Sequence, residues 1–147
     1  MVYLIDTNVL LAVAHPADSR YPVVQAAIRK LWVNAYDLQT TLQNFSEFWN
    51  VSTRPTDRNG FGRTSFETGQ LLQRLERLFP LLPDSPAMYP EWKRLVVNYR
   101  VLGVQVHDAR LVAAMLIHDV THILTFNTQD FTRYAPEGIV AVNPAAV

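Results

Sequence analysis

Residues 2–11 read VYLIDTNVLL, an apolar run that meets an acidic residue and then continues as a second apolar run. The first run predicts a buried strand, and Asp6, Thr7 and Asn8 are residue types that begin helices. The stretch therefore predicts a strand that ends at Asp6 and passes directly into a helix. In open parallel α/β sheets, ligands bind at the carboxyl ends of the strands. Asp6 is thus a candidate functional residue, and capping of the following helix is the alternative interpretation.

The rest of the chain alternates between strand and helix signals. Further strands are expected over 37–40, 80–83, 122–126 and 138–142. Helices are expected over 7–14, 23–33, 41–52, 65–79, 88–101 and 108–117. The 108–117 segment is apolar on nearly every face, which is typical of a buried helix. This alternation predicts an α/β fold with a mostly parallel sheet.

Several local features follow from the same patterns. Leu42, Phe45 and Trp49 recur at helical spacing and are expected to face the core, and Phe66 is expected on the apolar side of the 65–79 helix. Gly103 is expected to terminate the 88–101 helix. Residues 54–63 are rich in turn formers and are expected to be an exposed loop.

The composition is that of a globular protein. Hydrophobic residues make up 49% of the 147 positions, enough for a real core, and the length fits a single domain over 1–147. Basic and acidic residues number 13 each, so a nucleic-acid partner would have to meet a local basic patch. The absence of cysteine excludes disulfides and thiolate metal sites. The longest apolar run, 111–117, is shorter than the roughly 20 residues of a membrane span, so we expect a soluble, cytoplasmic protein without a membrane partner.

Three further carboxylates, Asp108, Glu47 and Asp130, lie on an expected helix or just after an expected strand. Asp108 opens the buried helix, where an unpaired charge would be costly, although helix capping would also explain it. Glu47 falls roughly opposite the apolar stripe of its helix at about 100° per residue, so it faces either a cleft or plain solvent. Asp130 follows the 122–126 strand, together with Asn127, and a simple turn is the alternative there. If these acids converge, a divalent cation relieves their repulsion, and carboxylate oxygens suit Mg²⁺ or Mn²⁺.

Other chemistries are disfavoured. His107 and His118 lie eleven positions apart on one expected helix, roughly 16 Å, and cannot share an ion there. The sequence lacks HExxH, GxxxxGK[ST] and GxSxG, which disfavours zinc proteases, P-loop nucleotidases and serine hydrolases. A phosphatase with an aspartate nucleophile at Asp6 would need a second acid at the position of Asn8.

Four segments taken together resemble the PIN domain family, and most closely the VapC-type toxins of bacterial type II toxin–antitoxin systems. They are LIDTNVLL (4–11), NFSEFW (44–49), HDARLVAA (107–114) and LTFNTQDF (124–131), in this order over essentially the whole chain. The resemblance implies a three-layer α/β/α sandwich with a central mostly parallel sheet. It also implies an Mg²⁺- or Mn²⁺-dependent endoribonuclease that forms a homodimer and is neutralised by a cognate antitoxin protein.

The family's functional acids carry over position by position. The first falls on Asp6, the helical glutamate on Glu47 and the third acid on Asp108. At the fourth position, where many members have an acid, this chain has Asn127, and Asp130 is the nearest carboxylate. One ion would be held by Asp6 and Asp108, and a second would lie near Glu47 and the corner formed by Asn127 and Asp130.

Supporting roles are expected for a threonine and four arginines. Thr125 would orient a ligand through a hydrogen bond. Phosphate contacts are expected from Arg54, Arg58 and Arg63 in the 54–63 loop and from Arg110 beside the third acid. These arginines would alternatively meet solvent or the antitoxin. The departure at the fourth acid also leaves a second function open, a PIN-like protein-interaction module with a weakened or inactive metal site.

Overall fold

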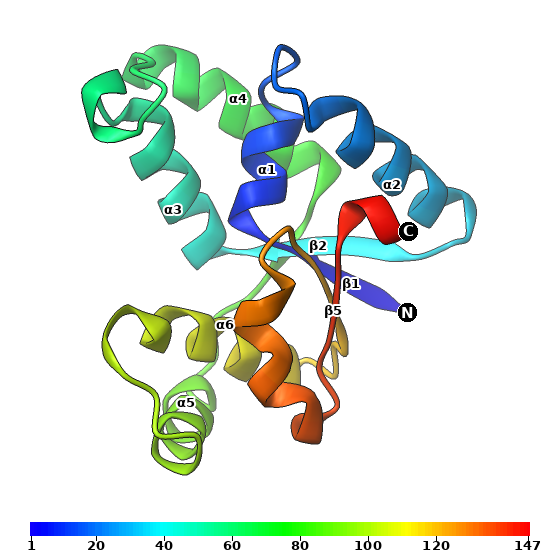
Figure 1. The fold of residues 1–147 in the computed structure, drawn as a ribbon, viewed down its shortest axis with the longest axis vertical. Helices are drawn as coiled ribbons and strands as arrows, with labels where there is room; N and C mark the ends of the chain where they lie inside the picture. Colours follow the sequence, from blue (N-terminus) through cyan, green and yellow to red (C-terminus); the bar gives the residue numbers. More distant parts are fainter.

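A five-stranded parallel sheet runs through the centre of the computed structural model, which describes residues 1–147 (Figure 1). Its strands are β1 (Val2–Ile5), β2 (Asp37–Thr41), β3 (Leu81–Leu82), β4 (His122–Leu124) and β5 (Val140–Val142), in the spatial order β3-β2-β1-β4-β5. The first strand is therefore the central one, and Leu4 pairs with Gln39 on one side and Ile123 on the other.

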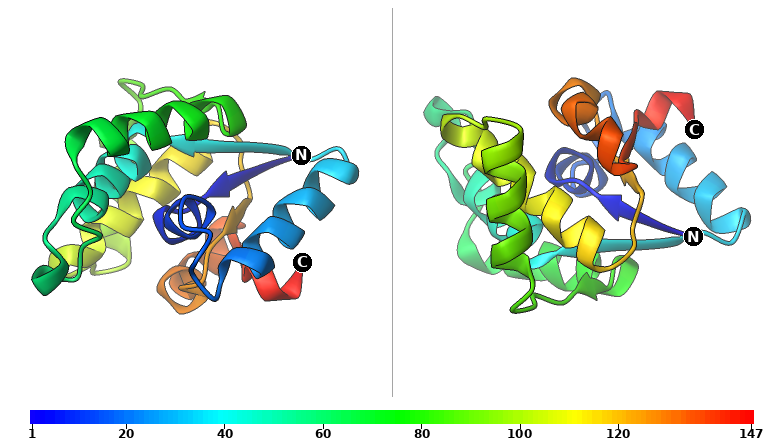
Figure 2. Two further views of the ribbon diagram at one scale, coloured as in Figure 1. Left: turned by 90° about the horizontal axis from the view of Figure 1, so that it is seen from above. Right: turned by 90° about the horizontal axis from the view of Figure 1, so that it is seen from below.

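Helices cover both faces of this sheet. They are α1 (Thr7–Val13), α2 (Tyr21–Val33), α3 (Leu42–Thr53), α4 (Ser65–Leu78), α5 (Met88–Asn98) and α6 (Val106–Ile117). Short 3₁₀ helices complete the chain: η1 (Thr56–Arg58), η2 (Gly103–Gln105), η3 (Thr128–Glu137) and η4 (Pro144–Ala146). Figure 1 shows α1 to α4 above the sheet and α5 and α6 below it, and Figure 2 shows the same layers from two further sides.

Alternation along β1 divides the core between these layers. Tyr3 and Ile5 belong to the cluster that contains the buried residues of α1 to α4, whereas Leu4 belongs to the cluster beneath, with α5, α6 and η3. Successive strand residues point to opposite faces, so a central strand that is apolar at every position is buried on both. The expected three-layer α/β/α sandwich is confirmed, and the sheet is parallel throughout.

Most expected elements are present, with shifted ends. The β4 strand stops at Leu124 rather than 126, because the Phe126 N–H turns away and donates to Asn8 Oδ1 at 3.1 Å. The α5 helix ends at Asn98 and is closed by Arg100, which is left-handed at φ 51°; Gly103, also left-handed at φ 56°, lies farther on, at the start of η2. The Val101 N–H then donates to Val96 O at 3.0 Å, the long bond of a Schellman ending.

The expected apolar faces of two helices were partly wrong. On α3, Leu42 and Trp49 are 52% and 37% exposed, while Phe45 and Phe48 enter the core. On α4, Phe66 is 74% exposed. A repeat of large apolar residues every three or four positions fits more than one helical stripe, and packing against the sheet selects which stripe is buried.

The segment after β4 forms a helix that the sequence patterns do not predict. The sequence predicts no helix between the strands expected over 122–126 and 138–142, with a turn at Asn127 and Asp130 as one alternative, but residues 128–137 form η3, in which Phe131 and Tyr134 are buried. The α6 helix also begins two residues before Asp108, at Val106, so Asp108 lies within its first turn. Its buried face agrees with the expectation. No helix here has both the length and the apolar character that a bilayer crossing requires.

Candidate active site

Asp6 lies at the carboxyl end of the central strand and is only 7% exposed. Its Oδ1 accepts hydrogen bonds from Thr7 N at 2.7 Å and from Asn44 Nδ2 at 3.3 Å. Its Oδ2 accepts from Thr125 Oγ1 at 2.7 Å. Asp6 therefore caps α1, as the alternative interpretation holds, but it is also fixed from α3 and from the end of β4. A cap alone needs no partner from other elements.

Glu47 faces these strand ends from α3. Its Oε2 accepts from Thr7 Oγ1 at 2.7 Å, and its Oε1 accepts from Gln43 Nε2 at 3.0 Å. The same Gln43 Nε2 donates to His107 O at 2.8 Å, which links α3 to the first turn of α6. The remaining amide atom, Gln43 Oε1, is buried and has no hydrogen-bond partner. Glu47 thus lies in a cleft wall and not on a plain solvent face.

The charge of Asp108 is paired with no basic side chain. The carboxylate is half-buried in the first turn of α6 and takes part in no ion pair. Burial, together with the negative charges of Asp130, Asp6 and Glu47, raises the pKa of Asp108 to about 7, against a smaller opposing effect of Arg133. An acid that is so costly to ionise is typical of a site prepared for a cation or for proton transfer.

The pKa of Asp6 is also raised, but less than that of Asp108. The pKa of Asp6 is raised to about 6, mainly by burial and also by the charges of Glu47 and Asp130, against the hydrogen bonds from Thr125 and Thr7, which lower it. Glu47 and Asp130 are therefore close enough in space to disfavour ionisation of both Asp6 and Asp108, although the four acids are far apart in the chain. The structure brings Asp6, Glu47, Asp108 and Asp130 together at the carboxyl edge of the sheet.

Asn127 and Asp130 take different places at this edge. Both are exposed, but the Asp130 carboxylate acts on the pKa of Asp6 and of Asp108, whereas the Asn127 side chain makes no hydrogen bond. The Asn127 backbone N–H donates to Thr125 Oγ1 at 3.0 Å. On this side of the site the negative charge therefore comes from Asp130, which lies on η3, and not from the position of Asn127.

Three of the four arginines expected to bind phosphate are remote from the acids. Arg54, Arg58 and Arg63 follow the end of α3 that points away from the sheet (Figure 1). Arg54 Nη2 donates to Asn59 O at 3.0 Å, and Arg63 donates to Ser52 Oγ at 3.2 Å. Two of them therefore stabilise the loop and its contact with the scaffold.

Arg110 and a residue missed from the sequence, Arg133, lie nearer. Arg110 lines a hollow together with Glu47. Arg133 lines a small polar cavity with Asp108 and Asp130, and its Nη2 donates to Gln105 Oε1 at 2.9 Å. Arg133 follows Asp130 by three positions, and residues three apart on a helix are neighbours. This spacing would have indicated that Arg133 lies near the site, but only if the segment had been known to be helical.

The polar residues around the acids were also missed. Gln43 and Asn44 precede Glu47 by four and three positions, the spacing that places side chains on one helical face. Thr7 accepts from Asn44 Nδ2 at 3.1 Å while donating to Glu47. Helical spacing from Glu47 was the available signal for the first two, and only the fold brings Thr7 to them.

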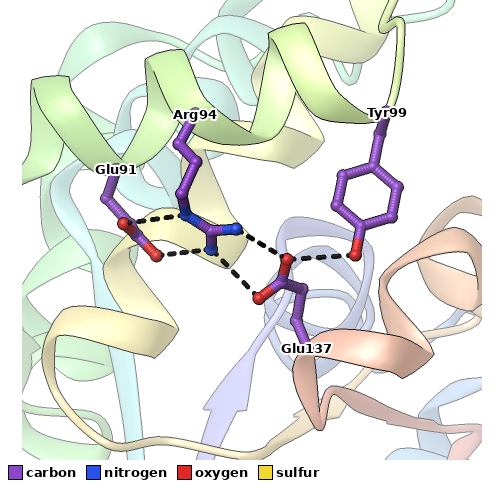
Figure 3. A network of polar contacts seen from close by, with 4 residues as sticks. All are labelled: Glu91, Arg94, Tyr99 and Glu137. Carbon is purple, nitrogen blue, oxygen red and sulfur yellow. Dashed lines mark hydrogen bonds and ion pairs between the residues drawn. The ribbon is translucent and has the colours of Figure 1, made fainter.

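An ion-pair network holds η3 in place (Figure 3). Arg94 of α5 donates to both carboxylate oxygens of Glu137, at 2.9 and 3.0 Å, and to both of Glu91, at 2.7 and 3.2 Å. Tyr99 OH also donates to Glu137, at 3.0 Å. Arg94 and Tyr99 lower the pKa of Glu137 against the effect of burial. Glu137 is the last residue of η3, so the network fixes the helix that carries Asp130 and Arg133.

The donor set fits a hard divalent cation. The four acids supply oxygen ligands without a basic partner in an ion pair, and the unpartnered Gln43 Oε1 offers one more acceptor beside Glu47. No three acid, histidine or cysteine side chains are already arranged as a ligand shell. Mg²⁺ usually takes only one or two protein carboxylates and keeps several waters, and Asp6 and Asp108 are the two carboxylates that would hold such an ion.

Comparisons with known proteins agree with this fold. The family model described as PIN domain matches residues 3–136. A search among curated protein sequences found no significant match. VapBC2 from Rickettsia felis, crystallised with a DNA fragment from its promoter, is similar at TM-score 0.72 and 9% identity, over 97% of this chain and 98% of that one.

Two further solved structures are similar. VapBC-1 from nontypeable Haemophilus influenzae has TM-score 0.69 and 14% identity, over 98% of each chain. VapC20 from Mycobacterium tuberculosis, a toxin described as cleaving the sarcin–ricin loop, has TM-score 0.63 and 16% identity, over 97% of this chain and 98% of that one. At such identities the similarity establishes a shared fold.

Proposed function

The chain belongs to the PIN domain family, and on this premise we propose that it is an Mg²⁺- or Mn²⁺-dependent endoribonuclease, the toxin of a toxin–antitoxin pair. The observation that carries the proposal is the convergence of Asp6, Glu47, Asp108 and Asp130 at the carboxyl edge of the sheet, with no basic partner in an ion pair. The description of VapC20 as a toxin that cleaves an RNA loop supports the same substrate class.

Each acid has a distinct role in this proposal. Asp6 and Asp108 would hold the ion directly, and Asp6 is kept in one orientation by Thr125. Glu47, fixed by Thr7, faces the hollow beside Arg110 and orients the attacking water. A divalent ion bound here would polarise the phosphodiester and neutralise the charge that develops on it.

Protons and the cation compete for Asp108. With its pKa raised to about 7, this carboxyl holds a proton through much of the neutral range until a cation replaces it. Asp130 adds negative charge at the outer side of the site and attracts the cation. Arg133 and Arg110 flank the acids on two sides, where they contact the phosphates of the bound strand.

The partners follow from the same family membership. We propose a single domain over residues 1–147 that acts in the cytoplasm, forms a homodimer and is neutralised by a cognate antitoxin. Two of the similar structures are VapBC proteins, which supports an antitoxin partner.

The test measures RNA cleavage and metal binding separately. Asp6→Asn and Asp108→Asn are expected to abolish cleavage of labelled RNA in Mg²⁺ or Mn²⁺ while both variants remain folded. They are also expected to lose the rise in melting temperature that Mn²⁺ gives the parent protein. Asp57→Asn, an exposed acid in η1, is the matched control and should behave as the parent does. Parental turnover in either site variant would remove the mechanism.

The second candidate is a protein-interaction module with a weakened metal site, favoured by Asn127 at the position where many family members carry an acid. The same titration separates the two functions. If Mn²⁺ leaves the melting temperature unchanged and no RNA is cut at any metal concentration, the interaction module is the better description.

A further inference from the structure

We propose that a groove next to the acidic cluster binds an unpaired RNA base, with Tyr89 as its stacking surface and Arg110 as the contact to the adjoining phosphate. The inference rests on the proposed function, because it names the part of the substrate that the site would hold beside the reacting phosphate. It makes single-stranded RNA, and not a regular duplex, the substrate class.

Two neighbouring hollows meet at Arg110. The first has a volume of about 400 Å³ and is lined by Tyr89, Trp92 and Met88 among others. The second has a volume of about 530 Å³ and is lined by Glu47, His107 and Asn50 among others. Arg110 lines both, so a strand with one phosphate near Glu47 can pass the guanidinium and place its next base against the aromatic rings.

Of the two aromatic rings, Tyr89 is exposed and Trp92 is held in place by a hydrogen bond. Tyr89 is 64% exposed, and its ring centroid lies 6.2 Å from that of Trp92, with the ring planes tilted by 31°. Trp92 Nε1 donates to Val106 O at 3.0 Å, which ties this ring to the first residue of α6. Because the same helix carries Asp108, the platform and the acidic cluster are held in one rigid relation.

Arg110 is available for a phosphate. Asp108 and Arg110 are two positions apart on α6, so their side chains leave the helix in different directions, one toward the acids and one toward the groove. The one ion pair of the guanidinium is with Asp84, at 3.8 Å, and both side chains are about half exposed. Such a surface pair is worth little, whereas Arg and a phosphate form a bidentate contact. Asp84, once released, remains at the rim as an acceptor for N–H groups of the base.

Loss of the stacking ring should weaken binding only of RNA that carries bases, whereas loss of the phosphate contact should weaken binding of any ribose-phosphate strand. This difference makes the proposal testable. Binding is measured by fluorescence anisotropy in the non-cleaving Asp6→Asn protein with Mg²⁺ present. The probes are a short labelled single-stranded oligoadenylate and an abasic ribose-phosphate oligomer of the same length. Tyr89→Ala should raise the Kd for oligoadenylate about 5- to 150-fold, the range of one lost base–aromatic stack, and leave the Kd for the abasic oligomer unchanged.

Arg110→Gln should weaken binding of both oligomers by the same factor, because it removes a phosphate contact. Tyr89→Phe keeps the ring and should bind as the parent does. Phe66→Ala removes an aromatic residue on α4 that is even more exposed than Tyr89, at 74%, and should have no effect. Melting temperatures confirm that each variant is folded.

Three results would overturn the proposal. One is an unchanged Kd for oligoadenylate in Tyr89→Ala, and another is a loss of affinity in Tyr89→Ala that is equal for oligoadenylate and the abasic oligomer. The third is a change in the particle mass of Tyr89→Ala in solution, which would assign the groove to a second copy of the chain. Failure of the nuclease proposal is seen separately, as absent cleavage by the parent protein, because the binding cycle does not depend on turnover.

Discussion

Thr7 Oγ1 donates a 2.7 Å hydrogen bond to Glu47 Oε2, joining the start of α1 to the middle of α3 across forty positions of sequence. Thr7 is buried, and its hydroxyl also accepts from Asn44, which in turn donates to Asp6. One hydroxyl therefore sets the orientation of two acids. Its loss should affect both the chemistry of the site and the stability of the fold.

Replacing this hydroxyl by a methyl group tests that inference. We expect Thr7→Val to lower kcat for RNA cleavage by about ten-fold or more, because Glu47 loses the donor that aims it, and to lower stability by about 1–3 kcal/mol. Thr7→Ser retains the hydroxyl and should keep most of the activity. Steady-state kinetics and urea denaturation measure the two effects. Equal kcat in Thr7→Val and Thr7→Ser would show that the hydrogen bond has no role in catalysis.

The raised pKa values of Asp6 and Asp108 predict an unusual dependence of stability on pH. Both carboxyls bind protons more tightly in the folded chain, at about 6 and about 7, than in the unfolded chain, where the pKa is about 3.9. Their contribution to stability is therefore fully present below the unfolded value and is lost as the pH rises through about 4 to 7. Without metal, the protein should melt at a lower temperature at mildly alkaline pH than at mildly acidic pH.

Asp108→Asn isolates the contribution of this residue. The neutral variant should show a weaker pH dependence than the parent and should melt higher than the parent at alkaline pH in the absence of metal. Mn²⁺ should raise the melting temperature of the parent most at alkaline pH, since protons then no longer compete for the carboxylates. A parent protein whose metal-free melting temperature climbs steadily from mildly acidic to alkaline pH would contradict the expectation.

Variants at Asp130 and Asn127 test separately which of the two positions provides the fourth acid of the site. We expect Asp130→Asn to raise the Mn²⁺ concentration needed for half of the thermal shift, because Asp130 supplies the outer negative charge of the site. Asn127→Asp in that background tests whether a charge at the neighbouring position restores binding. If Asp130→Asn titrates with Mn²⁺ as the parent does, Asp130 is an ordinary surface acid.

The network around Arg94 predicts a loss of stability together with a change at the site. Arg94→Gln removes both carboxylate contacts and should lower the free energy of unfolding by about 1 kcal/mol, a modest value because the guanidinium is partly exposed. The looser η3 should also raise the Mn²⁺ requirement of cleavage. Arg74→Gln, an exposed arginine of α4 outside any ion pair, is the control. A purely local loss of stability, with an unchanged Mn²⁺ requirement, would show that η3 needs no such support.

Local patterns were sufficient for the central strand and the buried helix. The apolar run that ends at Asp6 has only one reasonable reading, and α6 is too apolar to lie at a surface. The face of α3 was harder to assign. Trp49 and Phe48 are equally apolar, and only packing against the sheet determines that Phe48 is buried and Trp49 is partly exposed.

The environment of the acids could not be read from the sequence. A 3₁₀ helix such as η3 has no reliable periodic signature, so the placement of Asp130 and Arg133 depends on a turn geometry that composition does not reveal. The arginines of the 54–63 loop looked like phosphate ligands because they follow the Glu47 helix. The rise of α3 carries them away from the sheet edge, and their partners are backbone and hydroxyl groups of the scaffold.

The acids enter the cluster from both layers of the sandwich, the first at residue 6 and the last at residue 130. A chain still being synthesised has Asp6 and Glu47 long before Asp108 and Asp130 leave the ribosome. Half of the cluster cannot assemble until the final strands pair beside β1. The four-acid cluster is therefore complete only after the C-terminal part of the chain has folded, and a chain that stops before residue 108 lacks two of its four members.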